Sequence, residues 1–387
     1  MTMISSLQSI LVGALVLVAC DSPAPREESN KLNAQAGHRK QGNLKMRFDY
    51  SGAEAMLAML QRPAVTKTAI DSLLAIKTVR STLIENPARF IPNVKEDVLR
   101  ADIEHFVRTK EPISFEADNP FQLGDTWKNR KSIREMISRL RATENSVVPA
   151  TLQPLHRYSP DTMPLTVDIY FVAGGVSDGF VFDTLNTNVY INLARANGDY
   201  HGILSNIAHE TYHVIQKEAQ RRVAGLRVVA DSTDTLPVGE RLLARTLTEG
   251  TAFFVTDPTR TDERGRNMDK ARSRFRKNQK SKQVARNFAL FDSILREMLE
   301  GRAPWSKAEM EGFSNEAPFY FVGYEMAKAI DRYCGAECIK RAFVQQPVEF
   351  FRQYVALYRM HPDIIGRFSP ETEAFIEKSR QVTATMP

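Results

Sequence analysis

Residues 207–216 read IAHETYHVIQ, which places His209 and His213 four positions apart with Glu210 directly after the first histidine. On a helix, side chains four residues apart lie on one face with Cβ atoms about 5–6 Å apart, so both imidazoles can reach one zinc ion. The glutamate after the first histidine is then directed at the same ion, where it can act as a general base. This stretch therefore predicts a zinc-binding helix with His209 and His213 as metal ligands and Glu210 as the catalytic base.

The same stretch also fits an ordinary amphipathic helix. Over the expected helix, residues 202–217, both histidines lie on a polar side and the aliphatic residues lie on the other. Helical periodicity alone does not separate a surface helix from a metal-binding one. Because a catalytic zinc ion normally has three protein ligands and one open position, a third ligand elsewhere in the chain is the deciding evidence.

The best candidate for that ligand is Glu249, in the apolar segment 242–255, LLARTLTEGTAFFV. On a helix over residues 240–255 its carboxylate is partly desolvated, which requires a compensating cation. A zinc ion supplies one, and Arg245, one turn earlier, is the alternative. Gly250 permits a close approach between helices, which is needed if this helix packs under the zinc-binding one.

The pattern before the motif changes from helical to strand-like. Ser51 with Glu54 forms a capping box at the start of a helical region, and the chain is Pro-rich and irregular over 147–164. Alternating, β-branched and aromatic runs then predict strands at 165–172, 179–182 and 188–193. The expected fold class is α+β, mostly helical, with a small sheet before the metal-binding helix.

The order His-Glu-x-x-His, a loop, and Glu-Gly-x-Ala at 249–252 resembles the gluzincin metallopeptidases. The chain is also similar to bacterial families of predicted zinc-dependent peptidases, many of them lipoproteins. These share an opening like residues 48–55, a strand-turn-strand before the motif and a later Tyr-x-x-x-Tyr segment. The resemblance implies a zincin-like fold, a Zn²⁺ cofactor held by His209, His213 and Glu249, Glu210 as the base, and a peptide or protein substrate.

Two parts of the site stay open at this stage. Because 35 residues separate His213 from Glu249, more than in thermolysin-type enzymes, Glu240 is the alternative third ligand. A tetrahedral oxyanion needs a further donor besides the metal, and Tyr320 and Tyr324, four apart on an expected helix, are the candidates, with Tyr324 slightly favoured. The segment 179–193 is expected to supply an edge strand on which an extended substrate pairs.

The first 20 residues, MTMISSLQSILVGALVLVAC, contain an apolar run that is too short to span a bilayer and ends in small residues. This is typical of a signal peptide over 1–19, and Leu-Val-Ala-Cys resembles the bacterial lipobox, which implies a lipid on Cys20. We expect an exported lipoprotein, anchored in a membrane and facing the periplasm or cell exterior, with residues 20–43 as a polar tether. A plain secretory signal is the alternative, since no Lys or Arg precedes the apolar run.

The remaining boundaries and partners follow from composition. The expected parts are a helical region at 44–145, the sheet with the zinc-binding helices at 146–258, and a basic stretch with a helical C-terminal region at 259–387. The formal net charge of +6 comes mostly from residues 260–286, which have one aromatic residue, so a solvated basic helix or loop is favoured over nucleic-acid binding. Cys334 and Cys338 are expected to form a local disulfide, with free thiols as the next alternative and half of a metal site as the last.

The sequence thus favours a zinc metallopeptidase that hydrolyses peptide bonds. Two other classes remain: a catalytically inactive zincin-fold lipoprotein that acts as a binding module, and a zinc hydrolase with a non-peptide substrate. The presence of Glu210 favours an enzyme, because zinc binding needs the histidines and not this glutamate.

Overall fold

The computed structural model describes residues 44–383, apart from 90, 92–93, 114–118, 161–162, 182–186, 223–235 and 314–315. The expected signal peptide, Cys20 and the tether lie outside the described residues. The described residues belong to one compact unit, and none of their helices is long and apolar enough to cross a membrane.

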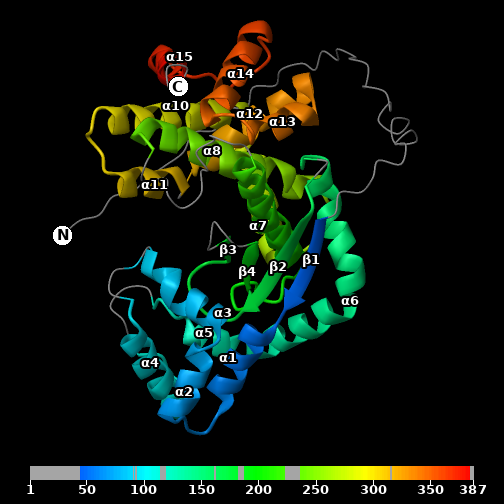
Figure 1. Ribbon diagram of the computed structural model, residues 1–387, viewed down its shortest axis with the longest axis vertical. Helices are drawn as coiled ribbons and strands as arrows, with labels where there is room; N and C mark the ends of the chain where they lie inside the picture. The colour runs from blue at the N-terminus through cyan, green and yellow to red at the C-terminus, as the bar shows by residue number, and fades with distance from the viewer. Residues whose placement is uncertain are drawn as a thin grey trace, which may run out of the picture. The chain divides into compact units, whose positions relative to one another are not determined.

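A four-stranded sheet lies beside the helix that carries the two histidines (Figure 1). Its strands are β1 (Leu44–Asp49), β2 (Leu165–Val172), β3 (Gly179–Val181) and β4 (Asn188–Asn192). The strand order is β1-β2-β4-β3, so β1 and β3 form the edges; β1 and β4 run parallel to β2, and β3 runs antiparallel to β4. Residues of β2 alternate between buried and partly buried, as a half-covered strand requires. This arrangement confirms the expected α+β class.

Strand β1 was not predicted, because residues 44–49 were assigned to the start of a helical region. The strand pairs with β2, far away in sequence, and Arg47 donates to Asp168 across the pair at 2.6 Å. A six-residue segment with three charged side chains has no strong local pattern, so its partner strand decides its conformation. Ser51 does not cap the following helix either. Helix α1 (Ser51–Gln61) has Tyr50 at the N-cap without a side-chain cap, and Glu54 is paired with Arg141.

The N-terminal part of the described chain is otherwise helical. Its elements after α1 are α2 (Lys67–Leu74), α3 (Lys77–Arg80), the π-helix η2 (Ser81–Glu85), the 3-10 turn η3 (Pro87–Arg89), α4 (Glu96–Thr109), α5 (Leu123–Lys128) and α6 (Arg130–His156). Helix α6 continues through Pro149 and Pro154, where an irregular segment was expected. Buried Val147, Leu152 and Leu155 pack against the core, and this burial offsets the hydrogen bonds that the two prolines remove.

The two helices with the candidate ligands follow the sheet. They are α7 (Tyr200–Arg221) and α8 (Val238–Val255), each slightly longer than predicted. Asp199 caps α7, because one of its oxygens accepts a hydrogen bond from the backbone N–H of Gly202. Its other oxygen accepts from the N–H groups of Asn267 and Met268 at the start of α9 (Arg266–Asn278). One buried carboxylate therefore fixes the starts of both helices.

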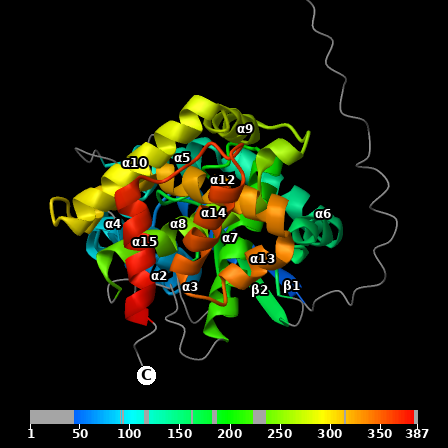
Figure 2. The same cartoon turned by 90° about the horizontal axis from the view of Figure 1, so that it is seen from above.

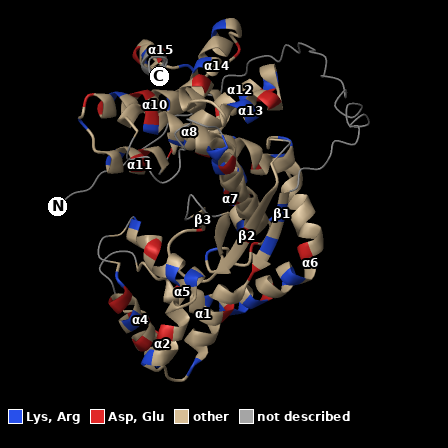
Figure 3. Ribbon diagram, in the orientation of Figure 1, with Lys and Arg blue, Asp and Glu red and all other residues tan. Residues whose placement is uncertain are grey.

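The C-terminal region is helical. Its elements are η5 (Pro258–Arg260), α9 (Arg266–Asn278), α10 (Ser281–Leu299), α11 (Trp305–Phe313), α12 (Pro318–Cys334), α13 (Ala336–Ala342), α14 (Pro347–Met360) and α15 (Pro370–Thr383). The other helices of this region lie around α8 and α12 (Figures 1 and 2). The basic stretch thus forms η5, α9 and the start of α10. Charged residues of both signs lie on most of the labelled helices (Figure 3).

Helices α8 and α12 cross at two glycines. A Cβ atom on Gly250 would lie 2.2 Å from the Cα of Gly323, so neither position has room for a side chain. Gly250 therefore does allow a close approach between helices. The sequence suggested the zinc-binding helix α7 as the partner, but the partner is α12. The crossing fixes the face of α12 that carries Tyr320.

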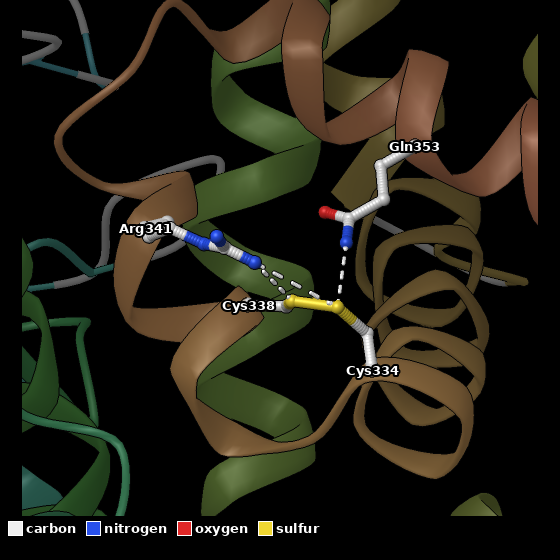
Figure 4. Close-up of a disulfide and its surroundings, with 4 residues drawn as sticks. All are labelled: Cys334, Cys338, Arg341 and Gln353. Atoms are coloured by element: carbon white, nitrogen blue, oxygen red, sulfur yellow. Dashed lines mark hydrogen bonds between the residues drawn. A yellow bond between two sulfur atoms is a disulfide. The ribbon is translucent and has the colours of Figure 1, made fainter.

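A disulfide joins Cys334, the last residue of α12, to Cys338 in α13 (Figure 4). The Arg341 guanidinium donates to the sulfur of Cys338 at 2.6 Å, and the Gln353 amide donates to that of Cys334 at 3.3 Å. The bond closes the turn between α12 and α13, at the end of α12 opposite to Tyr320.

Candidate metal centre

Three potential metal ligands converge where α7 meets α8. The Nε2 atoms of His209 and His213 are 3.1 Å apart, and the Oε2 atom of Glu249 lies 3.8 Å from the first and 3.3 Å from the second. Among the described residues, these three form the one group of His, Cys, Asp and Glu side chains placed to hold a metal ion. Glu240, the alternative third ligand, does not belong to it.

The separations fit a tetrahedral ion. Ligand atoms about 2.0–2.1 Å from zinc and at the tetrahedral angle lie about 3.3–3.4 Å from one another. The observed distances of 3.1, 3.3 and 3.8 Å are close to that value. Two imidazole nitrogens and one carboxylate oxygen are also a donor set that zinc prefers at sites with an open position. The residues present therefore fit a zinc ion.

Glu249 is 9% exposed and remains ionised. Burial alone raises its pKa, but interactions with His213 and His209 and the charge of Arg245 hold the pKa well below its usual range. The pairing with Arg245 expected as an alternative is present too, at 3.7 Å from the other carboxylate oxygen, Oε1. The two interactions use different oxygens, so Arg245 leaves Oε2 directed at the histidines.

Gln216 orients one of the histidines. Its amide nitrogen donates to the backbone carbonyl of Thr248 and to the hydroxyl of Thr251, both at 2.8 Å. Because a carbonyl can only accept, the amide nitrogen must face Thr248, and the amide oxygen then lies 2.8 Å from Nδ1 of His213. That oxygen needs a donor, so Nδ1 carries the proton and Nε2 keeps its lone pair for a metal.

Glu210 lies beside the ligand group and lines the same cleft. The residue is 8% exposed, and burial raises the pKa of its carboxyl to about 7, with the electrostatic interaction with His209 acting in the opposite direction. A carboxyl group with such a pKa accepts and releases a proton readily near neutral pH, which is the property that a general base requires.

The cleft has a volume of about 510 Å³ and is lined by residues from the sheet edge and from four helices, as well as from the segment after η2. Edge strand β3 borders it, because Gly179, Phe180 and Val181 all line its wall. The turn before β3 is held by Asn192, whose amide nitrogen donates to the carbonyls of Gly174, Gly175 and Ser177. Asn192 thus positions the edge strand.

The two candidate tyrosines are separated by the structure. Tyr320 lines the cleft, and its ring stacks on Phe253, whose ring also contacts His209. Tyr324, which the sequence slightly favoured, does not line the cleft. Its hydroxyl donates to Asp257 at 2.7 Å and accepts from Gln279 at 2.9 Å. Residues four apart on α12 share a side only approximately, and the crossing at Gly323 directs Tyr324 toward the core instead.

A family profile matches residues 70–363, which is most of the chain and includes every residue of this centre. The family, DUF5700, is described as "Putative zinc dependent peptidase". The chain belongs to this family. No curated protein and no solved structure matches the chain.

The structure places His209, His213 and Glu249 together, with Glu210 on the same cleft, whereas the residues that hold these side chains in place were not predicted. Gln216 was visible three residues after His213, a spacing at which helical side chains meet. Nothing in the sequence pointed to Asn192 or to Thr248, because their roles depend on contacts across the fold.

Proposed function

We propose that the protein is a zinc-dependent metallopeptidase, with His209, His213 and Glu249 as metal ligands and Glu210 as the general base. The observation that carries the proposal is the convergence of three ligand atoms, within 4.8 Å of one another, on the wall of a cleft that Glu210 also lines. Membership of a zinc-peptidase family supports the same activity. The order of the ligands is that of the gluzincins.

A bound zinc ion supplies Lewis acidity, which polarises the substrate carbonyl and makes water more acidic. Glu210 accepts a proton from the attacking water and delivers it to the leaving amine when the peptide bond breaks. Its burial keeps bulk water away from this proton transfer. Gln216 is a positioning residue and does not contact the metal itself. It holds His213 in the tautomer that presents Nε2 to the metal.

Tyr320 is the proposed oxyanion donor, in place of Tyr324. Among the described residues its hydroxyl has no hydrogen-bond partner, and it faces the cleft. Burial and the negative charge of Glu249 raise its pKa, so the hydroxyl keeps its proton at neutral pH. A protonated hydroxyl can donate to negative charge that develops on the substrate oxygen.

Edge strand β3 supports a peptide as the substrate. An edge strand presents unpaired backbone N–H and C=O groups, and an extended peptide can add to it as a further strand. Both β3 and Glu210 line the cleft, so the backbone of a peptide paired with β3 would pass the metal ligands. A binding module without activity would not require Glu210, and a non-peptide substrate would not require the edge strand.

Anchoring by a lipid on Cys20 and a location facing the periplasm or cell exterior are part of the proposal. They are supported by the apolar run and the Leu-Val-Ala-Cys sequence at its end. Metabolic labelling of cells with a radioactive fatty acid tests this, with Cys20→Ser as the control. Label on the wild type and none on the variant supports the anchor, and unlabelled wild type rejects it.

The activity is tested by incubating the full chain with a mixed peptide library and identifying the cleavage products. Glu210→Gln should retain zinc and lose hydrolysis, because the amide cannot accept the proton of the attacking water. His213→Ala should lose both. Full activity in Glu210→Gln would reject the mechanism.

A further inference from the structure

A pair of polar side chains on the wall of the cleft has no part in the mechanism proposed above. The amide nitrogen of Asn86 donates to the hydroxyl of Ser177 at 2.8 Å, and both residues line the cleft. Asn86 is 1% exposed, and Ser177 is partly buried. We infer that this pair binds the backbone of the substrate by hydrogen bonds, at the point where a peptide paired with β3 leaves the strand. The inference rests on the proposed function, which puts a peptide in the cleft.

The pair keeps hydrogen-bonding groups for a ligand. The backbone of Asn86 is satisfied, because its N–H donates to the carbonyl of Ser81 and its carbonyl accepts from the N–H of Arg89. Within the part of the chain that the structure describes, the amide oxygen of Asn86 and the hydroxyl proton of Ser177 have no partner. A carboxamide and a hydroxyl that share one hydrogen bond keep at least one donor and one acceptor, whichever way the amide is turned. These are the two groups that a peptide unit requires of its partner.

Asn86 and Ser177 are held in place by a tight contact between η2 and the turn before β3. A Cβ atom on Gly175 in this turn would lie 2.8 Å from the carbonyl oxygen of Thr82 in η2, and Gly175 has a φ of +80°. A side chain is excluded there by the close backbone and by the left-handed conformation. The carbonyl of Ser177 also accepts a hydrogen bond from the Asn192 amide at 3.0 Å. Because both segments are fixed in this way, little order has to be gained when a substrate binds.

The π-helix η2 supports a functional role for Asn86 independently of Ser177. Its last turn is closed by the hydrogen bond from the N–H of Asn86 to the carbonyl of Ser81, five residues earlier, at 2.9 Å. Such a turn contains one residue more than an α-helical turn. Turns of this kind are rare in proteins and are found frequently at functional sites.

The pair lies next to the strand on which the substrate is proposed to pair. Gly179, the first residue of β3, follows Ser177 by two residues, so the two lie within about 7 Å of each other. An edge strand binds an extended peptide through backbone groups, which are the same in every sequence. Asn86 and Ser177 offer the same kinds of group directly before β3. They therefore lengthen the surface that binds the substrate backbone, and since both are neutral they add no preference for a charged side chain.

The test measures binding and so does not depend on hydrolysis. The probe is a labelled octapeptide of alanine, titrated with the full chain that carries Glu210→Gln. It is compared with analogues in which one backbone N–H at a time is replaced by an ester oxygen, which removes a donor and weakens the neighbouring carbonyl as an acceptor. At the position that meets the pair, the ester should bind about 2- to 10-fold more weakly than the parent peptide, the effect of one hydrogen bond between neutral groups.

Ser177→Ala should remove most of the ester penalty at that one position and leave the penalties at the other positions unchanged. Ser177→Thr keeps the hydroxyl and should retain the penalty. Asn86→Ala should reproduce the loss, although it also removes a buried side chain and so lowers stability. Ser146→Ala is the matched control, because this exposed serine of α6 bonds to the carbonyl of Thr143 and does not line the cleft.

A purely structural role of the pair would weaken the binding of all the peptides equally. Ester penalties that are the same with Ser177 and with Ser177→Ala, at every position, overturn the inference. The proposed function is tested separately by cleavage with the wild-type protein. A wild-type protein that cleaves no peptide contradicts the function, whereas cleavage by the wild type together with unchanged ester penalties in Ser177→Ala contradicts the inference alone.

Discussion

Oε1 of Gln216 lies 2.8 Å from Nδ1 of His213, and the amide nitrogen of the same Gln216 is held by Thr248 and Thr251 on the neighbouring helix. One side chain thus connects α7 to α8 and fixes the protonation of a metal ligand. The zinc-binding geometry therefore depends on the packing of two helices as well as on the three ligands.

Replacing Gln216 by methionine should weaken zinc binding by about 10- to 100-fold, the range found when an outer partner of a metal-binding histidine is lost. Methionine preserves most of the volume but offers no strong acceptor to Nδ1 of His213. The measurement is competition for zinc with a calibrated chelator. Glu218→Gln, two residues further along α7 and paired with Arg221 and Arg222, is the control and should leave the affinity unchanged.

Gly250→Ala should destabilise the protein by about 1–3 kcal/mol, the usual cost of forcing extra atoms into a packed interior. The new Cβ would meet the backbone of Gly323 at 2.2 Å, and backbone cannot move aside as a side chain can. Urea unfolding measures the change.

Gly124→Ala is the matched control, because its Cβ would meet only Pro112 at 3.5 Å. In helix α5 that alanine should be neutral or stabilise by up to about 1 kcal/mol. Equal effects at the two positions would argue against the tight crossing of α8 and α12.

Tyr320→Phe should affect mainly the catalytic rate, and Tyr324→Phe should affect mainly the stability of the protein. Tyr320→Phe should lower kcat by about 10²-fold with little change in stability, as expected for loss of one oxyanion donor. Tyr324→Phe should keep kcat but lower the free energy of unfolding by about 1–3 kcal/mol, because Asp257 loses a buried hydrogen-bond donor. Steady-state kinetics and urea unfolding of both variants decide the matter, and the reverse pattern would return the donor role to Tyr324.

Asp102 should make the stability of the protein depend on pH. Its carboxyl is fully buried in α4, and one of its oxygens, Oδ2, has no hydrogen-bond partner among the described residues. Burial raises its pKa in the folded state, while a hydrogen bond from the N–H of Ile113 opposes the shift. A raised pKa means that the folded state favours the protonated form. That contribution is complete below the unfolded pKa of about 3.9 and is lost as pH rises through the folded pKa.

Asp102→Asn keeps a neutral side chain at every pH, so its stability relative to the wild type should increase from acid to neutral pH. Unfolding in urea at a series of pH values measures the difference. A difference that stays constant across the series would show that Asp102 has an ordinary pKa in the folded protein.

The features that could be predicted from the sequence were those set by local spacing. The strand at 165–172 alternates with a period of two, and the pair His209 and His213 has the period of a helix, so each pattern specifies its own structure. Strand β1 and the passage of α6 through Pro149 depend on contacts with distant residues, and these override local propensity. Which of the two tyrosines lines the cleft depends on the way α12 crosses α8 at Gly250 and Gly323. The spacing of Tyr320 and Tyr324 in the sequence contains no information about that crossing.

The zinc content of the full chain, purified without chelators and measured by atomic emission for the wild type and single variants, tests the metal centre directly. We expect one zinc ion per wild-type chain, and none in His213→Ala or Glu249→Ala. Glu240→Ala, on the same helix as Glu249 but outside the ligand group, should retain the ion. Wild-type protein without zinc, or full zinc content in Glu249→Ala, would contradict the assignment of this centre.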